Sequence, residues 1–122
     1  SYIMRRHPAV LENLAQTPVG SVCISAITEG ELLYGLARRP SRSRSEAVHA
    51  FLARVEILPW SREEATRYGP LRAQQEERGF PLAPLDMQIA AHAVATDTVL
   101  VSSDQAFSNV QGLTVVDWTK QP

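Results

Sequence analysis

The stretch that most constrains the fold is residues 21–36, SVCISAITEGELLYGL. Residues 22–25 suit a short buried strand, and the apolar residues after them recur with the three-to-four spacing of an amphipathic helix. A strand that runs directly into a helix is one half of the unit that joins parallel strands through helices. The stretch therefore predicts an α/β protein.

The helix in this stretch carries an acidic residue, Glu31, beside its apolar side. Ile27, Glu31 and Tyr34 are spaced by four and three residues, so they share one face. The leucines of the same helix are expected to form an apolar stripe beside that face: Leu32, Leu33 and Leu36. An acid in a helix is usually a solvated charge, because Glu is seldom buried unpaired. Glu31 is therefore a candidate site residue only if other carboxylates lie near it.

The rest of the chain alternates helices and strands. We expect helices over residues 9–16, 46–55, 62–78 and 84–95, and strands over residues 55–60, 98–102 and 114–118. Ser61 and Glu64 form a capping box at the start of one helix, and Pro70 predicts a kink or a break within it. This alternation predicts a single α/β domain over residues 1–122, with a central parallel sheet and helices on both faces in three α/β/α layers.

Composition limits the classes of function. A net charge of −1 and a pI near 6.3 mean that any nucleic-acid binding must come from local patches. The single cysteine, Cys23, excludes a disulfide framework and favours a reducing cytoplasm. The chain has no run of eighteen apolar residues and no apolar signal core, so we expect neither membrane spanning nor export.

One candidate patch lies in the segment ARRPSRSRS, residues 37–45. Its four basic residues are all arginines: Arg38, Arg39, Arg42 and Arg44. Pro40 is expected to end the preceding helix, which leaves the arginines on a connecting loop. The segment is either a solvated connection or a surface that contacts a nucleic-acid backbone, because arginine side chains suit phosphates. An arginine-rich genome gives the same bias, since eleven of the twelve basic residues are arginine.

Three acids are expected at one edge of the sheet. Asp86 lies in the first turn of a helix, Asp104 comes just after a strand, and Glu31 lies on the helix after another strand. Ligands of such sheets bind beyond the carboxyl ends of the strands. Three converging carboxylates need a divalent cation to neutralise them, and oxygen-only ligands favour Mg²⁺ or Mn²⁺ over zinc. The alternative is that these acids are helix caps and surface charges.

His92 lies among the small apolar residues of the helix that begins near Asp86. We expect it to be a core residue with one hydrogen bond rather than a metal ligand.

The ordered set ISAITEGELLYGL, PLDMQIAAHA and LVSSDQAF, followed by a strand ending in DW, resembles the PIN-domain ribonuclease toxins of the VapC type over nearly the whole chain. The resemblance implies that Glu31, Asp86 and Asp104 hold Mg²⁺ or Mn²⁺ and activate water to cut a phosphodiester of RNA. It further implies a homodimer, a VapB-like antitoxin whose arginine-bearing tail blocks the site, and structured RNA, often tRNA, as the substrate.

The chain departs from this pattern in two places. The family usually has Thr-Asn where this chain has Ser102 and Ser103; Ser102 keeps a hydroxyl that can orient a carboxylate or contact phosphate, and Ser103 lacks the amide. The family also opens with a strand ending in a Leu-Asp-Thr-Asn type motif, and residues 1–8, SYIMRRHP, resemble the segment just after that motif. The resemblance therefore predicts an N-terminally incomplete domain that lacks the middle strand of the sheet and the first acid.

Three explanations for the missing strand stay open: residues upstream of Ser1, a strand from another chain, or a degenerate relative. Two functions stay open with them. One is a toxin-type, metal-dependent endoribonuclease, and the other is a catalytically impaired module that binds antitoxin or dimerises. A phosphoacceptor receiver-type domain is disfavoured, because it generally needs a lysine at a strand end and the only lysine is Lys120 near the end of the chain.

Overall fold

A computed structural model describes residues 2–4 and 22–117 of the chain. The helix expected over residues 9–16 lies outside these ranges. The described elements occur in this order: β1 Tyr2–Met4, β2 Val22–Ser25, α2 Ala26–Arg38, α3 Arg42–Arg54, β3 Glu56–Leu58, α4 Arg62–Glu77, α5 Pro84–Ala95, β4 Val99–Val101, the 3-10 helix η3 Gln105–Asn109, and β5 Val115–Val116.

The strands form one parallel sheet. Its order is β3-β2-β1-β4-β5, and every pair of neighbours runs in the same direction. Parallel neighbours need crossover connections, and helices supply them between β2 and β3 and between β3 and β4. The predicted α/β class with a central parallel sheet is confirmed.

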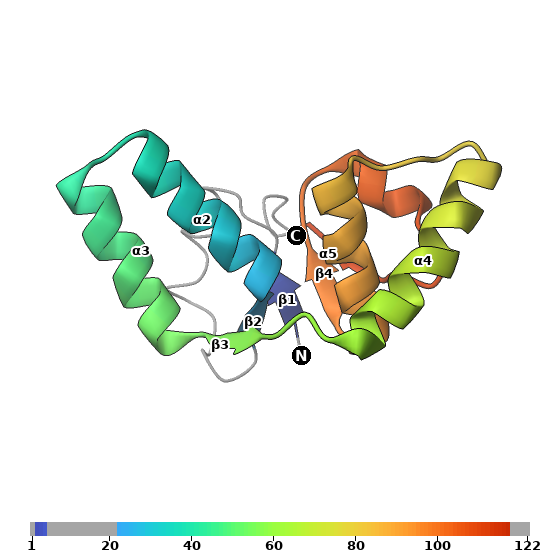
Figure 1. Cartoon of the computed structure of the whole chain (residues 1–122), viewed down its shortest axis with the longest axis horizontal. Coiled ribbons are helices and arrows are strands. Elements are labelled where there is room, and N and C mark those ends of the chain that lie inside the picture. Colours follow the sequence, from blue (N-terminus) through green and yellow to red (C-terminus); the bar gives the residue numbers. More distant parts are fainter. Residues whose placement is uncertain (1, 5–21, 118–122) are drawn as a thin grey trace.

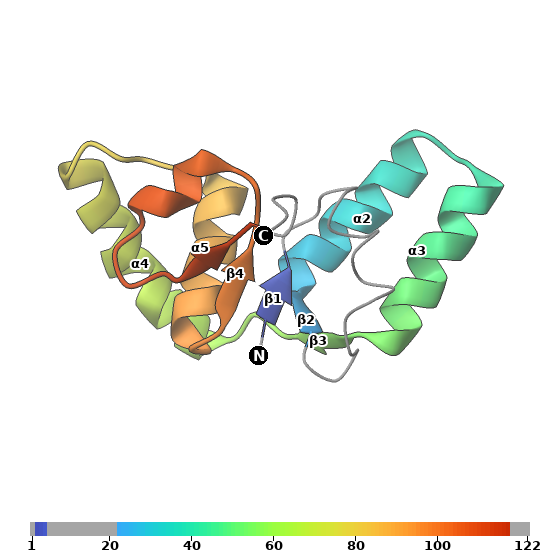
Figure 2. The same cartoon turned by 180° about the vertical axis from the view of Figure 1, so that it is seen from behind.

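Helices cover both faces of the sheet. Figures 1 and 2 show α2 and α3 together on one side of the strands and α4 and α5 on the other. Successive residues of a strand point to opposite faces, so Val22, Ile24 and Val101 pack on the side of α2 and α3, where Leu32 and Val55 join them. Within the described ranges no helix combines the length and the apolarity needed to cross a membrane.

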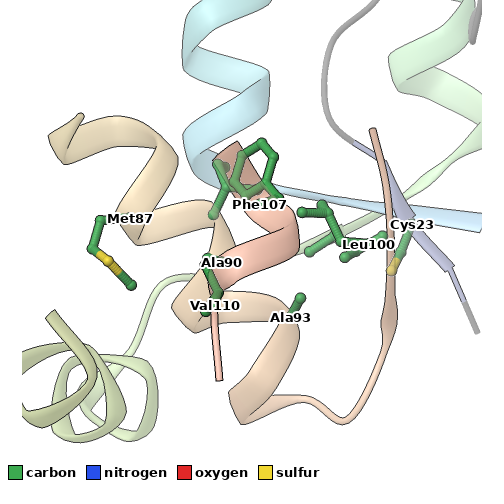
Figure 3. Packing of buried hydrophobic residues seen from close by; sticks show 9 residues of the cluster. Cys23, Met87, Ala90, Ala93, Leu100, Phe107 and Val110 are labelled. Atoms are coloured by element: carbon green, nitrogen blue, oxygen red, sulfur yellow. The ribbon is translucent and has the colours of Figure 1, made fainter. Parts of the chain in front are cut away.

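The other face of the sheet holds the larger cluster of buried residues (Figure 3). Cys23 and Leu100 point toward α5, whose alanines Ala90 and Ala93 are fully buried. Small residues let the helix approach the sheet closely, and Phe107 from η3 closes the cluster with 1% of its surface exposed. This packing positions α5, which carries Asp86 at its start.

The expected gap in the middle of the sheet is not present. Strand β1 lies between β2 and β4 and pairs with both, with Ile3 opposite Cys23 on one side and Leu100 on the other. The neighbouring strands contribute only four and three residues, so a three-residue segment is long enough to pair with each of them. The prediction that β2 lacks its neighbour within this chain is therefore wrong.

The start of α4 has the capping box predicted from the sequence. The Ser61 backbone N–H donates to Glu64 Oε1 over 2.7 Å, and the Ser61 hydroxyl donates to the same oxygen over 2.6 Å. Of the kink or break predicted at Pro70, the break is not present, because α4 continues through Pro70 to Glu77. Pro70 removes one backbone donor, but it lies on the exposed side of the helix, where water can satisfy the carbonyl that loses it.

Candidate active site

Glu31 is the sixth residue of α2 and is half-buried. The buried side of α2 is formed by Thr28 and Leu32, which are four residues apart. The predicted leucine stripe is only partly right, because Leu33 is 39% exposed, and Tyr34 on the same helix is 61% exposed. Glu31 therefore borders a buried surface, as the spacing predicts, but the apolar stripe beside it is narrower than expected.

Asp86 lies in the first turn of α5 and is half-buried. Pro84 is the first residue of the helix, and the capping residue Ala83 supplies no side-chain hydrogen bond. The first backbone N–H groups of a helix lack intrahelical partners and favour a negative charge nearby. The position of Asp86 is the one predicted from the sequence.

Asp104 and Ser102 lie beyond the carboxyl end of β4. The Ser102 hydroxyl accepts a hydrogen bond from the Asp104 backbone N–H over 3.1 Å, and Ser102 is buried. Asp104 is exposed, and its Oδ1 accepts from the Ala106 backbone N–H over 2.9 Å at the start of η3. Ser102 thus shapes the turn that carries Asp104, and a direct contact of Ser102 with substrate stays a prediction.

The three acids come from elements at the carboxyl side of the sheet, but they are not gathered into one group. In the part of the chain that the structure describes, no three His, Cys, Asp or Glu side chains lie close enough to hold a metal ion together. Mg²⁺ often takes only one or two carboxylates and keeps several waters, so Glu31 and Asp86, on the contacting helices α2 and α5, have the right chemistry for it. The full ligand set stays a prediction.

The residue directly after strand β1 is a cation in the sequence. Arg5 comes next after Met4 and lies outside the described residues. The resemblance implies a strand in the middle of the sheet that ends in an acid, and β1 takes that place in the sheet order. Residues 1–8, however, resemble the segment just after that acid, so Arg5 does not correspond to it.

Sequence reasoning missed a buried polar contact between β2 and α5. His92 Nδ1 lies 2.7 Å from the Ser25 hydroxyl, and both residues are fully buried. The full burial of His92 and this hydrogen bond confirm the prediction that it is a core residue. Serine is a common helix cap, so the local sequence around Ser25 indicates only a capping role. Its contact with His92 is seen only in the tertiary structure.

The surroundings of His92 favour its neutral form. Burial lowers the pKa of His92, and the Glu64 carboxylate and the Pro59 carbonyl oppose that shift. The Trp60 ring lies edge-on to the imidazole with ring centroids 5.5 Å apart. Protonation of this ring in the folded protein is therefore unfavourable.

This burial predicts a pH dependence of stability. Unfolded His92 takes up a proton near pH 6.5, whereas the folded ring does so only at a lower pH, so lowering the pH from 7.5 to 5.5 should cost up to about 1.4 kcal/mol. Glu64, whose pKa is lowered by the Ser61 hydrogen bonds, loses its contribution only below its unfolded value of 4.5. Urea unfolding at both pH values checks this, and an equal pH dependence in His92→Asn would contradict it.

The four arginines lie at the ends of two helices rather than on a loop. Arg38 is the last residue of α2, Arg39 caps it, and α3 already begins at Arg42, with Arg44 in its first turn. The predicted loop is wrong because Ser41 caps α3: its hydroxyl accepts from the Arg44 backbone N–H over 3.4 Å. All four side chains are exposed.

Comparison with known proteins agrees with this fold. The family model described as "PIN domain" matches residues 1–113. The chain belongs to the PIN-domain family.

Two relatives place this PIN domain among VapC proteins. It is 31% identical over 120 residues to the "tRNA(fMet)-specific endonuclease VapC" of Shigella flexneri, which covers 97% of this chain and 91% of the relative. It is 31% identical over 119 residues to "Ribonuclease VapC2" of Haemophilus influenzae, which covers 96% of this chain and 90% of that protein.

Solved structures of VapBC complexes share the fold. The chain matches VapBC2 from Rickettsia felis, solved with a DNA fragment from its promoter, with a TM-score of 0.82 and 27% identity over 96% of this chain and 98% of that one. It matches DNA-bound VapBC from Salmonella typhimurium with a TM-score of 0.81 and 26% identity, covering 97% and 98% of the two chains. The PIN-like α/β/α fold predicted from the sequence is confirmed.

Proposed function

We propose that this PIN domain is the ribonuclease toxin of a VapBC-type toxin–antitoxin pair and acts on RNA in the bacterial cytoplasm. The observation that carries the proposal is the near-full-length similarity to VapC ribonucleases, at 31% identity over 97% of the chain. The placement of Glu31 on α2 and of Asp86 at the start of α5 supports it, because these helices contact one another on the carboxyl side of a parallel sheet.

The proposed cofactor is Mg²⁺ or Mn²⁺. Glu31 and Asp86 would supply oxygen ligands, with Asp104 available from the turn after β4. When bound, such an ion lowers the pKa of a water molecule and neutralises charge on a phosphodiester. Within the protein, Ser102 holds the turn of Asp104 in place through its 3.1 Å hydrogen bond to the Asp104 backbone.

The same relatives indicate the substrate and the partners. The Shigella and Salmonella relatives are both named tRNA(fMet)-specific endonucleases, so we propose a structured RNA of the tRNA class as substrate. The matched VapBC structures support a VapB-like antitoxin as partner, and we propose that the toxin forms a homodimer.

The direct test is RNA cleavage by the purified chain. We expect tRNA to be cut in the presence of Mg²⁺ or Mn²⁺, to be left intact in excess EDTA, and to be cut again when Mn²⁺ is restored. Intact tRNA at saturating metal would contradict the ribonuclease proposal for this chain.

A second candidate is a module that binds antitoxin or dimerises without cutting RNA. The observation that favours it is that, among the described residues, no three His, Cys, Asp or Glu side chains lie close enough to hold a metal ion together. Each carboxylate missing from such a site removes an oxygen ligand and a compensating negative charge, both of which weaken cation binding. Stable binding of a VapB-like antitoxin together with no metal-dependent cleavage would favour this candidate.

The exposed arginines give a prediction about RNA affinity. If Arg39 and Arg44 contact RNA phosphates, changing both to alanine should weaken binding of all sequences alike and reduce the slope of log affinity against log salt by about 2. Arg42 is less suitable for this test, because its side chain already forms an ion pair with Glu46 at 3.4 Å. Fluorescence anisotropy at several salt concentrations measures the slope, and an unchanged slope would remove these arginines from the RNA surface.

A further inference from the structure

We propose that the buried hydrogen bond between Ser25 and His92 is a positioning contact that sets Glu31 and Asp86 at the same height on two neighbouring helices. The inference rests on the proposed function, because it concerns the two acids assigned to metal binding. Neither Ser25 nor His92 is assigned to touch metal or RNA. Their role is to fix how α2 and α5 are placed relative to each other.

Ser25 joins three elements through one side-chain oxygen. It is the last residue of β2, and its Oγ accepts from the Ile27 backbone N–H over 3.0 Å, which caps α2. The remaining hydroxyl hydrogen can donate to His92 Nδ1 on α5, 2.7 Å away. The neutral imidazole then carries its hydrogen on Nε2, and the end of the sheet, α2 and α5 are connected at one point.

The spacing of the acids from this point is symmetric. Glu31 comes six residues after Ser25, and Asp86 comes six residues before His92. Figure 1 shows that α2 rises away from β2 while α5 runs down toward β4, so the two helices point in opposite directions. With a rise of 1.5 Å per residue, both acids lie about 9 Å from the hydrogen bond along the helix axes, and on the same side of it.

The surroundings of the Ser25–His92 hydrogen bond restrict its geometry. Ser25 and His92 are both 0% exposed, so water cannot replace either partner. Trp60, which comes after β3, packs edge-on against the imidazole from another direction. A slip of α5 along α2 by one residue would break this contact and leave buried polar groups unpaired, which is strongly penalised.

The first test measures Mn²⁺ affinity by titration calorimetry. Positioning partners behind metal ligands typically change metal affinity by about 10–100-fold, so we expect Ser25→Ala and His92→Phe each to weaken Mn²⁺ binding within that range. The double variant should bind Mn²⁺ no more weakly than either single variant, because both substitutions remove the same contact. Ser25→Thr keeps the hydroxyl and should retain most of the parent affinity.

The matched control is Ser41→Ala. Ser41 caps α3 as Ser25 caps α2, with its hydroxyl accepting from the Arg44 backbone N–H, but it makes no contact with α5 among the described hydrogen bonds. Its loss should lower stability slightly and leave Mn²⁺ affinity unchanged. Equal effects of Ser25→Ala and Ser41→Ala on Mn²⁺ affinity would mean that only helix capping matters and would overturn the proposal.

The second test needs neither metal nor activity. Spin labels at the exposed positions Leu33 on α2 and Leu85 on α5, in a Cys23→Ala background, report the distance between the helices by double electron–electron resonance. We expect one narrow distribution in the parent and in Ser41→Ala, and a broadened or shifted one in Ser25→Ala. An unchanged distribution in Ser25→Ala would overturn the positioning role.

The two tests separate this inference from the proposed function. A parent protein that binds no Mn²⁺ and cuts no RNA contradicts the ribonuclease proposal, while the distance measurement still decides whether Ser25 and His92 position the helices. A parent that binds Mn²⁺ with an affinity that Ser25→Ala does not alter overturns the inference and leaves the proposed function intact.

Discussion

Asp86→Asn should reduce metal-dependent RNA cleavage at least about a hundredfold, because even residues behind metal ligands change metal affinity about 10–100-fold and Asp86 is assigned as a ligand itself. The substitution keeps the size of the side chain and removes its charge. It should cost the protein little stability, since a charge in the first turn of a helix contributes about 0.3–1 kcal/mol. Cleavage rates at several Mn²⁺ concentrations, together with urea unfolding, separate the two effects.

Asp97→Asn is the matched control for this variant. Asp97 lies past the other end of α5, is exposed, and has a φ of 53°, a conformation that asparagine tolerates well. The same chemical change there should leave cleavage at the parent rate. If Asp86→Asn also kept the parent rate, Asp86 would have no place among the metal ligands, and if the parent itself were inactive, the binding-module candidate would be favoured.

Ile3→Ala should lower the free energy of unfolding by about 2–5 kcal/mol, which is the usual cost of removing a large buried side chain. Ile3 is 0% exposed and lies in the middle strand, with Cys23 and Leu100 as its partners on either side. Its loss would leave a cavity between the sheet and α5. Urea unfolding followed by circular dichroism gives the value.

Ile57→Ala is the control for position in the sheet. Ile57 lies in the edge strand β3 opposite Ile24 and is only half-buried, so its truncation should cost clearly less than that of Ile3. Equal costs at the two sites, or a negligible cost at Ile3, would contradict the central place of β1. Strand β1 separates β2 from β4, so Ile3→Ala also tests the part of the sheet that positions Glu31 and Asp104.

Much of the fold was predictable because it rests on local pattern. The helix expected over residues 84–95 coincides with α5, and the capping box at Ser61 forms as predicted. Helix boundaries were predicted wrongly where several neighbouring residues can serve as the helix cap. Several serines can cap α3, and Ser41 does so earlier than expected, which moves two arginines from a loop into a helix.

The candidate site was predictable only in part. The positions of Glu31, Asp86 and Asp104 relative to strands and helices could be read from the sequence, because each lies next to a local signal. Whether three carboxylates meet depends on how distant elements pack, and the described residues contain no such group of three. Local periodicity also could not separate Leu32, which is buried, from Leu33, which is 39% exposed.

The sequence by itself determined the α/β class, the order of most elements and the local positions of the candidate acids, because apolar periodicity and capping act over a few residues. Only the tertiary structure decided that Tyr2–Met4 fills the middle of the sheet and that Ser25 meets His92. These two features depend on pairing and packing between segments far apart in the chain. A strand of three residues and a buried serine have no local signature that would reveal their partners.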